Sequence, residues 1–167
     1  MPILNDRQIK QKVRRLAYEI IEQNFDAESI YLAGINNNGI AFANRLNAQL
    51  RAIDTCPFDV HLLQVRLNPA SPLSEDIQII PSAIDLTDKN VILIDDVANT
   101  GRTLYYAFRP FMEMILSKLE VAVLIDRKHK NFPIQVNYVG LTLATTLRDH
   151  VKVNLTSDQR DSVEFSA

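Results

Sequence analysis

The stretch that decides the fold of this 167-residue chain is Val91-Ile92-Leu93-Ile94-Asp95-Asp96-Val97-Ala98-Asn99-Thr100-Gly101-Arg102-Thr103. Its first four residues are apolar and mostly β-branched, which is typical of a short buried strand. Two adjacent carboxylates end the strand, and a Thr-Gly turn then leads into an amphipathic run over residues 104–116. The stretch therefore predicts a strand, an acidic pair, a polar loop and the N-terminus of a helix, in that order.

Each part of this stretch suits one group of a phosphorylated sugar. A loop that feeds a helix N-terminus aims free backbone N–H groups at one point, where the helix dipole favours an anion. Gly101 removes the side chain that would obstruct a phosphate, and Thr100 and Thr103 add hydroxyl donors. Carboxylates at the carboxyl end of a strand, such as Asp95 and Asp96, suit sugar hydroxyls or a hydrated Mg²⁺ held with substrate phosphates.

Length and composition are those of a single globular domain. Apolar residues make up 47% of the chain and charged residues 23%, and we expect one domain with its own core. No apolar run is long enough to span a membrane, and no secretory signal is recognised. With one cysteine, Cys56, the chain is expected to be cytoplasmic. The net charge of −2 gives no global attraction to nucleic acid, so RNA binding needs a local basic patch.

Strands alternate with helices along the chain, which predicts an α/β fold with a mainly parallel sheet. Asn5 or Asp6 caps a helix that runs to about Asn24, with its apolar residues at helical spacing. The other expected elements are a strand at 30–34, a polar turn at 36–39, a helix at 40–50, and strands at 58–65, 120–125, 136–139 and 151–155. Residues 157–167 are expected to be a polar, partly disordered tail.

Residues 67–82 contain three prolines and little regular pattern. A loop of this length in a compact domain is usually functional, and its place just before the central strand suits a lid over the site. Residues 77–80 within it are predicted to form a β-arm.

Residues 91–103 resemble the phosphoribosyl-pyrophosphate (PRPP) motif of type I phosphoribosyltransferases at every fixed position. The similarity extends to one subfamily, the pyrimidine operon attenuation regulators that are also uracil phosphoribosyltransferases. It is carried by VRRLAYEIIE at 13–22, LAGINNNGI at 32–40 with ANRL at 43–46, AVLIDRKHK at 122–130 with FPI at 132–134, and YVG at 138–140.

The resemblance implies a type I phosphoribosyltransferase fold over residues 1–167. Such a fold has a mainly parallel central sheet of about five strands, helices on both faces and a small hood built from the termini. The implied reaction transfers the 5-phosphoribosyl group of PRPP to uracil or a close nucleobase, giving UMP and pyrophosphate with substrate-bound Mg²⁺, in pyrimidine salvage and nucleoside metabolism. A homo-oligomer, dimeric or larger, is also implied.

The resemblance also assigns roles to individual residues. Catalysis at the ribose, with Mg²⁺ nearby, falls to Asp95 and Asp96. The 5′-phosphate is assigned to Val97, Ala98, Asn99, Thr100, Gly101, Arg102 and Thr103. Pyrophosphate is assigned to Asn36, Asn37, Asn38 and Gly39, with Arg66 from the lid. The base is assigned to Asp126, Arg127, Tyr138 and Val139, and an RNA surface to Arg14, Arg15, Lys128 and Lys130.

The chain departs from the subfamily pattern on the pyrophosphate side. Asn38 stands where an Arg usually precedes the glycine, so one charge-assisted contact to pyrophosphate is missing. Residues 67–87 contain no Lys or Arg, and Gln135 and Leu141 replace basic residues of the RNA-binding relatives. Two alternatives to an active uracil enzyme therefore stay open. One is a weakly active or inactive, nucleotide-responsive RNA-binding regulator of pyrimidine genes, and the other is a purine phosphoribosyltransferase.

Overall fold

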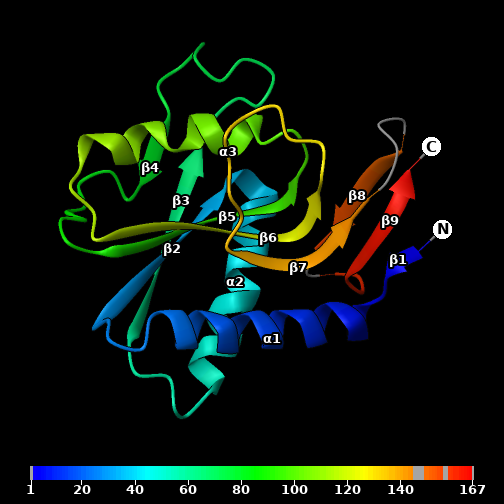
Figure 1. Cartoon of the computed structure of the whole chain (residues 1–167), viewed down its shortest axis with the longest axis horizontal. Helices are drawn as coiled ribbons and strands as arrows, with labels where there is room; N and C mark the ends of the chain where they lie inside the picture. The colour runs from blue at the N-terminus through cyan, green and yellow to red at the C-terminus, as the bar shows by residue number, and fades with distance from the viewer. Residues whose placement is uncertain (1, 145–148, 156–157, 167) are drawn as a thin grey trace.

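A computed structural model describes residues 2–144, 149–155 and 158–166, and its main element is a six-stranded sheet (Figure 1). The strands follow the order β4 (Gln78–Ile80), β3 (Asp59–Arg66), β2 (Ser29–Ile35), β5 (Asn90–Ala98), β6 (Lys118–Arg127) and β7 (Tyr138–Leu143). All neighbours are parallel except β4, which runs antiparallel to β3. The α/β class is confirmed. The sheet has six strands instead of about five because the expected β-arm joins its edge as β4.

The central strand β5 alternates its side chains between two cores. Ile92 and Ile94 face a core with helices α1 (Asp6–Gln23) and α2 (Asn36–Ala52), whereas Val91 and Leu93 face a core with α3 (Arg102–Ala107) and the 3₁₀ helix η1 (Arg109–Glu113). Because side chains of a strand alternate with period two, a strand buried on both faces is apolar throughout. Helices therefore cover both faces of the sheet, as expected (Figure 1).

Helix α1 agrees closely with the sequence-based expectation. Asn5 is its N-cap, and the Asn5 side chain and Gln8 form a reciprocal capping box. Of the five apolar residues expected on one face, Ile9, Val13, Leu16 and Ile20 are buried and Ile21 is half-buried, and Ala17 is buried as well. In the part of the chain that the structure describes, no helix is long and apolar enough to cross a membrane.

A three-stranded sheet at the chain ends forms the hood, with strand order β1 (Pro2–Leu4), β9 (Ser162–Ser166) and β8 (His150–Asn154) (Figure 1). Arg45 of α2 donates two hydrogen bonds to Asp161, which lies just before β9. One runs from Nε to Oδ2 and the other from Nη2 to Oδ1, both at 2.6 Å. The expected polar tail is therefore wrong over 162–166, where Val163 is fully buried. Ser157 and Ala167 lie outside the described residues.

Two other local predictions are corrected. The polar turn expected at 36–39 is instead the first turn of α2, which begins at Asn36. The helix expected over 104–116 is shorter: α3 ends at Ala107 and η1 at Glu113. Pro110 lies in the first turn of η1, and a proline cannot donate the backbone hydrogen bond that would continue an α-helix through it.

Candidate functional site

The acidic pair and the residues assigned to the 5′-phosphate and to pyrophosphate lie in or directly after β5 and β2, at the carboxyl edge of the sheet where β2, β5 and β6 lie side by side. The chain leaves β2 toward β3 on one side and leaves β5 toward β6 on the other. The loops after β2 and β5 therefore lie at the switch point of the sheet, the usual ligand-binding crevice of open α/β sheets. Register pairs Ala98 of β5 with Asp126 of β6, so the end of β6 lies beside the loop that follows β5.

The two carboxylates of the acidic pair differ in accessibility. Asp95 is buried, and its Oδ1 accepts a hydrogen bond of 2.9 Å from the Asp96 N–H. Asp96 is half-buried, and its Oδ1 accepts from the Val97 N–H at 2.8 Å. Burial, and then the neighbouring Asp96 carboxylate, raise the pKa of the Asp95 carboxyl well above its usual range. Asp96 is thus the more exposed member of the pair.

The 5′-phosphate loop, residues 97–103, wraps a small hollow of about 50 Å³. Its lining consists of Asp95, Val97, Ala98, Asn99, Thr100, Gly101, Arg102, Thr103 and Leu104. Gly101 has φ 85°, in the left-handed region that favours glycine. A Cβ atom on Gly101 would also lie only 3.0 Å from Ile134 Cγ1. The residues assigned to the 5′-phosphate therefore line one hollow next to the acidic pair.

The base-side segment, residues 126–134, is joined to the 5′-phosphate loop by Lys130. The Lys130 ammonium donates to Asp126 Oδ1 at 2.6 Å, to the Asn99 carbonyl at 3.0 Å and to the Ala98 carbonyl at 3.3 Å. It also donates to the Arg127 carbonyl. The sequence assigned Lys130 to an RNA surface, and its spacing of four residues from Asp126 was the only available signal of this internal role.

The pyrophosphate loop, residues 36–39, lies against the start of the lid. Asn36, at φ 51°, donates from Nδ2 to the Leu67 carbonyl at 3.0 Å and accepts from the Leu67 N–H at 3.1 Å. A cavity of about 620 Å³ opens beside it, lined by Asn36, Asn37, Gln64, Arg66, Leu67, Asn68, Glu75, Asp76 and Gln78. One cation and two carboxylates are among these residues, so the pyrophosphate side carries more negative than positive charge.

Gly39 explains how the pyrophosphate loop comes close to the acidic pair. A Cβ atom at Gly39 would lie 2.5 Å from the Ile94 carbonyl oxygen, immediately before Asp95. Only a residue without a side chain allows the first turn of α2 to approach β5 this closely. Asn37 and Asn38 are exposed on that turn.

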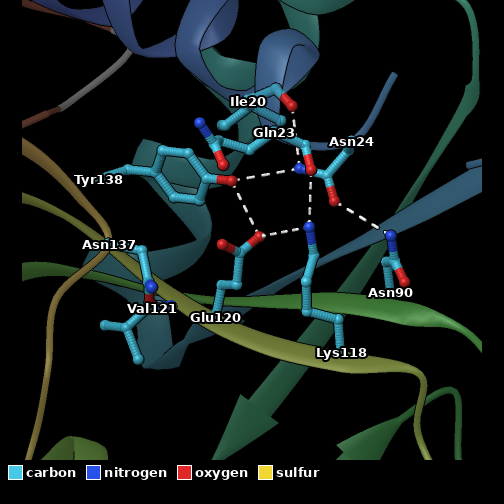
Figure 2. Close-up of polar contacts among 9 residues, drawn as sticks. All are labelled: Ile20, Gln23, Asn24, Asn90, Lys118, Glu120, Val121, Asn137 and Tyr138. Carbon is cyan, nitrogen blue, oxygen red and sulfur yellow. Dashed lines mark hydrogen bonds and ion pairs between the residues drawn. The ribbon is translucent and has the colours of Figure 1, made fainter. Parts of the chain in front are cut away.

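The Tyr138 side chain, which was expected to flank the base, instead lies in a buried polar network with Asn24 and Glu120 (Figure 2). Its ring is 1% exposed, and its hydroxyl donates to Glu120 Oε1 at 2.8 Å and accepts from Asn24 Nδ2 at 3.2 Å. Burial, and then the Glu120 carboxylate, raise the pKa of the Tyr138 hydroxyl. Tyr138 pairs in register with Ala122, which faces the α1 core, so its side chain faces that core too.

The other residues assigned to the base differ in burial and in their hydrogen-bond partners. Arg127 is buried, and its Nη1 donates to the Asp149 carbonyl at 2.6 Å. Asp126 is half-buried and paired with Lys130, and Val139 is half-buried on the strand after Tyr138. Asp126, through its carboxylate, and Arg127, through its carbonyl, both accept from the Lys130 ammonium and are thereby linked to the 5′-phosphate loop.

Two of the four residues expected on an RNA surface make internal contacts. Arg15 donates from Nη2 to the Gly140 carbonyl at 2.7 Å and pairs with Glu19 at 2.7 Å. The Lys130 ammonium is held by the contacts described above. Arg14 and Lys128 are exposed. Within the described ranges, no cluster of three or more His, Cys, Asp or Glu residues could hold a metal ion.

Comparisons with known proteins agree with this geometry. A model of the phosphoribosyl transferase domain matches residues 2–159. The bifunctional protein PyrR of Streptococcus sanguinis (strain SK36) is 34% identical, with 96% of this chain and 94% of the relative covered. The protein of the same name from Bacillus mycoides (strain KBAB4) is 33% identical, with 98% and 95% covered.

Solved structures show the same fold at lower identity. A hypoxanthine-guanine phosphoribosyltransferase from Bacillus anthracis has a TM-score of 0.70 at 23% identity, with 85% of this chain and 81% of that chain covered. A hypoxanthine phosphoribosyl transferase from Trypanosoma cruzi has a TM-score of 0.75 at 16% identity, with 99% and 91% covered. Because the family model and relatives above 30% identity both extend over most of the sequence, this chain belongs to the phosphoribosyl transferase domain family.

Proposed function

We propose that the protein transfers the 5-phosphoribosyl group of PRPP to uracil or a closely related base, releasing pyrophosphate. The observation that carries this proposal is the hollow that Asp95 of the acidic pair and the 5′-phosphate loop line together. The base-side segment holds the same loop through the bond from the Lys130 ammonium to the Asn99 carbonyl. The resemblance to pyrimidine operon attenuation regulators supports uracil as the base. The hypoxanthine-type neighbours are below 25% identity and bear on the fold alone.

In this proposal the chain acts by positioning and electrostatics. Backbone N–H groups of the 5′-phosphate loop hold the phosphate, and the half-buried Asp96 accepts from the ribose hydroxyls. Positive charge develops on the ribose in an oxocarbenium-like transition state, and the adjacent carboxylates favour it. Asp95 supports Asp96 through the bond from its Oδ1 to the Asp96 N–H.

Magnesium fits this site only as an ion that arrives with the substrate. Mg²⁺ is typically held by one or two carboxylates together with substrate phosphates. Asp95 and Asp96 supply two carboxylates in the second half of β5, which continues to Ala98 instead of ending at the pair as expected. When bound, Mg²⁺ would neutralise charge on the pyrophosphate. That contribution matters here because the pyrophosphate side has Arg66 against Glu75 and Asp76.

A second candidate function is a nucleotide-responsive regulator with little turnover. The charge balance of the 620 Å³ cavity favours it, because a site that must bind pyrophosphate normally offers more cations. RNA binding by such a regulator would rely on the exposed Arg14, Arg15 and Lys128, since the Lys130 ammonium is taken up by internal contacts.

The test is an assay of purified protein with PRPP, Mg²⁺ and uracil, hypoxanthine, guanine or adenine, following pyrophosphate release. We expect release with uracil, loss of the signal in Asp96→Asn, and an unchanged signal in Asp54→Asn, which removes an exposed carboxylate elsewhere. Release with a purine alone would assign a purine transferase. Silence with every base in protein that still binds UMP would favour the regulator, and salt-dependent retention of RNA would then identify its partner.

We also propose a cytoplasmic homo-oligomer, as the resemblance implies. Light scattering coupled to gel filtration measures the mass directly. A mass of 19.0 kDa, that of one chain, would contradict this part of the proposal.

A further inference from the structure

Three successive carbonyls of the 5′-phosphate loop are held by one short run of the base-side segment. The Ala98 and Asn99 carbonyls accept from the Lys130 ammonium at 3.3 and 3.0 Å. The Thr100 carbonyl accepts from the Asn131 and Phe132 N–H groups at 2.9 and 3.2 Å. All three carbonyls therefore point toward residues 130–132.

This arrangement determines where the loop's donors point. In a planar trans peptide the C=O and N–H groups point in opposite directions. The carbonyls of Ala98, Asn99 and Thr100 share their peptide planes with the N–H groups of Asn99, Thr100 and Gly101. Residues 126–134 do not line the 50 Å³ hollow, so the hollow lies on the side of the loop away from them. Three consecutive N–H donors are thus turned toward the hollow.

Lys130 is not itself available as a phosphate ligand. An ammonium has three N–H donors, and the Lys130 ammonium already has four acceptors: Asp126 Oδ1 and three carbonyls. Its side chain is 21% exposed and forms an ion pair with Asp126 at 2.6 Å. The negative ends of the carbonyl dipoles converge on this ammonium and would repel one another without it. Its positive charge compensates them and keeps the loop in this conformation.

We propose that Lys130 is the positioning residue that holds the 5′-phosphate loop with its N–H groups aimed at the phosphate. The inference rests on the proposed function, because it takes the hollow to be the 5′-phosphate site. It links phosphate binding to the base-side segment, since the same ammonium holds Asp126 and two carbonyls of the loop.

The test compares Lys130→Met, which keeps the length of the side chain and removes its charge and donors, with Lys10→Met. Lys10 on α1 also pairs with an aspartate four residues away, Asp6 at 2.7 Å, but is exposed, and it serves as the matched control. Calorimetric titration with UMP and NMR titration with uridine separate the phosphate contribution from the base contribution. We expect Lys130→Met to weaken UMP binding about tenfold and to change uridine binding less than twofold. Lys10→Met should bind both as the wild type does.

Salt distinguishes positioning from a through-space charge effect. If Lys130→Met weakens UMP binding because the loop is no longer positioned, the loss of affinity persists at high ionic strength. If Lys130 attracts the phosphate through space, salt screens that attraction in the wild type and the difference disappears. The UMP defect of Lys130→Met should therefore remain at about 1 M salt. A defect that disappears there, or equal losses for UMP and uridine, would overturn the proposal. Lys130→Arg, which keeps the charge and several donors, should recover most of the UMP affinity.

A measurement on the wild type covers the case in which Lys130→Met does not fold. Inorganic phosphate, followed by amide NMR shifts, should move the Asn99, Thr100 and Gly101 signals most, and larger shifts elsewhere would contradict the inference. A different result would contradict the proposed function alone. If the wild type binds UMP and Lys130→Met binds it more weakly, but the wild type transfers no phosphoribosyl group, the positioning role of Lys130 stands. Protein that binds no 5′-phosphate at all overturns both.

Discussion

Among the site residues, Asp95 is the one whose ionisation the folded structure opposes most strongly. Its carboxyl is buried beside Asp96, and both burial and that neighbour raise its pKa. Between the unfolded pKa of about 3.9 and the raised folded pKa, the folded protein binds more protons than the unfolded chain. The contribution of this group to stability is therefore complete at low pH and is lost as pH rises through the folded pKa.

Replacing Asp95 with Asn should stabilise the unliganded protein at high pH. The Asn keeps an oxygen that accepts from the Asp96 N–H and removes the buried charge. We expect a higher Tm than the wild type at pH 8, little difference at pH 4, and a loss of turnover. Thermal unfolding at the two pH values measures this, with Asp54→Asn as the exposed control. A lower Tm for Asp95→Asn at pH 8 would show that the buried charge is stabilised by the fold.

Asn38 stands where the subfamily pattern has an Arg, and a substitution there tests whether the missing cation weakens PRPP binding. It is exposed on the first turn of α2, next to Asn37, which lines a cavity together with Arg66, Glu75 and Asp76. A charge-assisted hydrogen bond contributes about 1.5–3 kcal/mol, so Asn38→Arg should lower the KM for PRPP by about tenfold or more. Asn44→Arg, an exposed substitution on the same helix, is the control. Equal KM values for Asn38→Arg and the wild type would rule out this explanation of weak turnover.

At the scale of elements, a buried polar network fastens the end of α1 to three strands (Figure 2). Asn24, just after α1, contacts Tyr138 of β7 at 3.2 Å and Asn90 of β5 at 3.1 Å. Glu120 of β6 accepts from Tyr138 and pairs with Lys118 at 3.3 Å. These residues lie near the amino ends of β5 and β6, whereas the acidic pair lies toward the carboxyl end of β5. The network therefore has a structural role.

Tyr138→Phe should separate stability from catalysis. It removes the hydroxyl and leaves the Glu120 carboxylate with one partner fewer in a buried place, which costs about 1–2 kcal/mol. Chemical denaturation should show this loss, while the KM for uracil stays within about twofold of the wild type because the ring does not reach the site. Tyr18→Phe, at a 42% exposed position on α1, is the control. A selective rise in the uracil KM would restore Tyr138 to the base site.

At the scale of the whole molecule, a charged clamp joins the hood to the body. The Arg45 guanidinium is bidentate to Asp161, and the Asp161 N–H donates to Asp6 Oδ1 at 3.3 Å. Asp161 is 7% exposed, so removal of its partner leaves a largely buried carboxylate without its cation. The clamp joins strand β9 of the hood to helix α2, which begins at the pyrophosphate loop.

Arg45→Met should therefore destabilise the protein by about 2 kcal/mol, or about 4–8 °C in Tm for a chain of this size. The matched control is Arg51→Met on the same helix, where the arginine is exposed and bonds Asn47 at 3.0 Å. Thermal unfolding compares the two variants. The double variant Arg45→Met with Asp161→Asn should recover part of the loss, and no recovery would mean that the clamp is not the cause.

The sequence by itself determined the elements whose signals are local. The apolar strand before Asp95, the loop to Thr103 and the capped, amphipathic α1 are set by spacing along a few residues. Long-range contacts decided the rest. Tyr138 faces α1 because β7 pairs with β6 in one register, and residues 162–166 became a strand because β1 and β8 lie on either side of them.

Lys130 shows the same division at the site. Its charge and its place near the base-side segment are evident from the sequence, but an exposed lysine in a charged turn is equally compatible with an RNA surface. Only the pairing of Ala98 with Asp126 across β5 and β6 brings its ammonium to the carbonyls of the 5′-phosphate loop. Side-chain periodicity is a property of one element. The partners that a charged side chain contacts depend on which elements become neighbours in the fold.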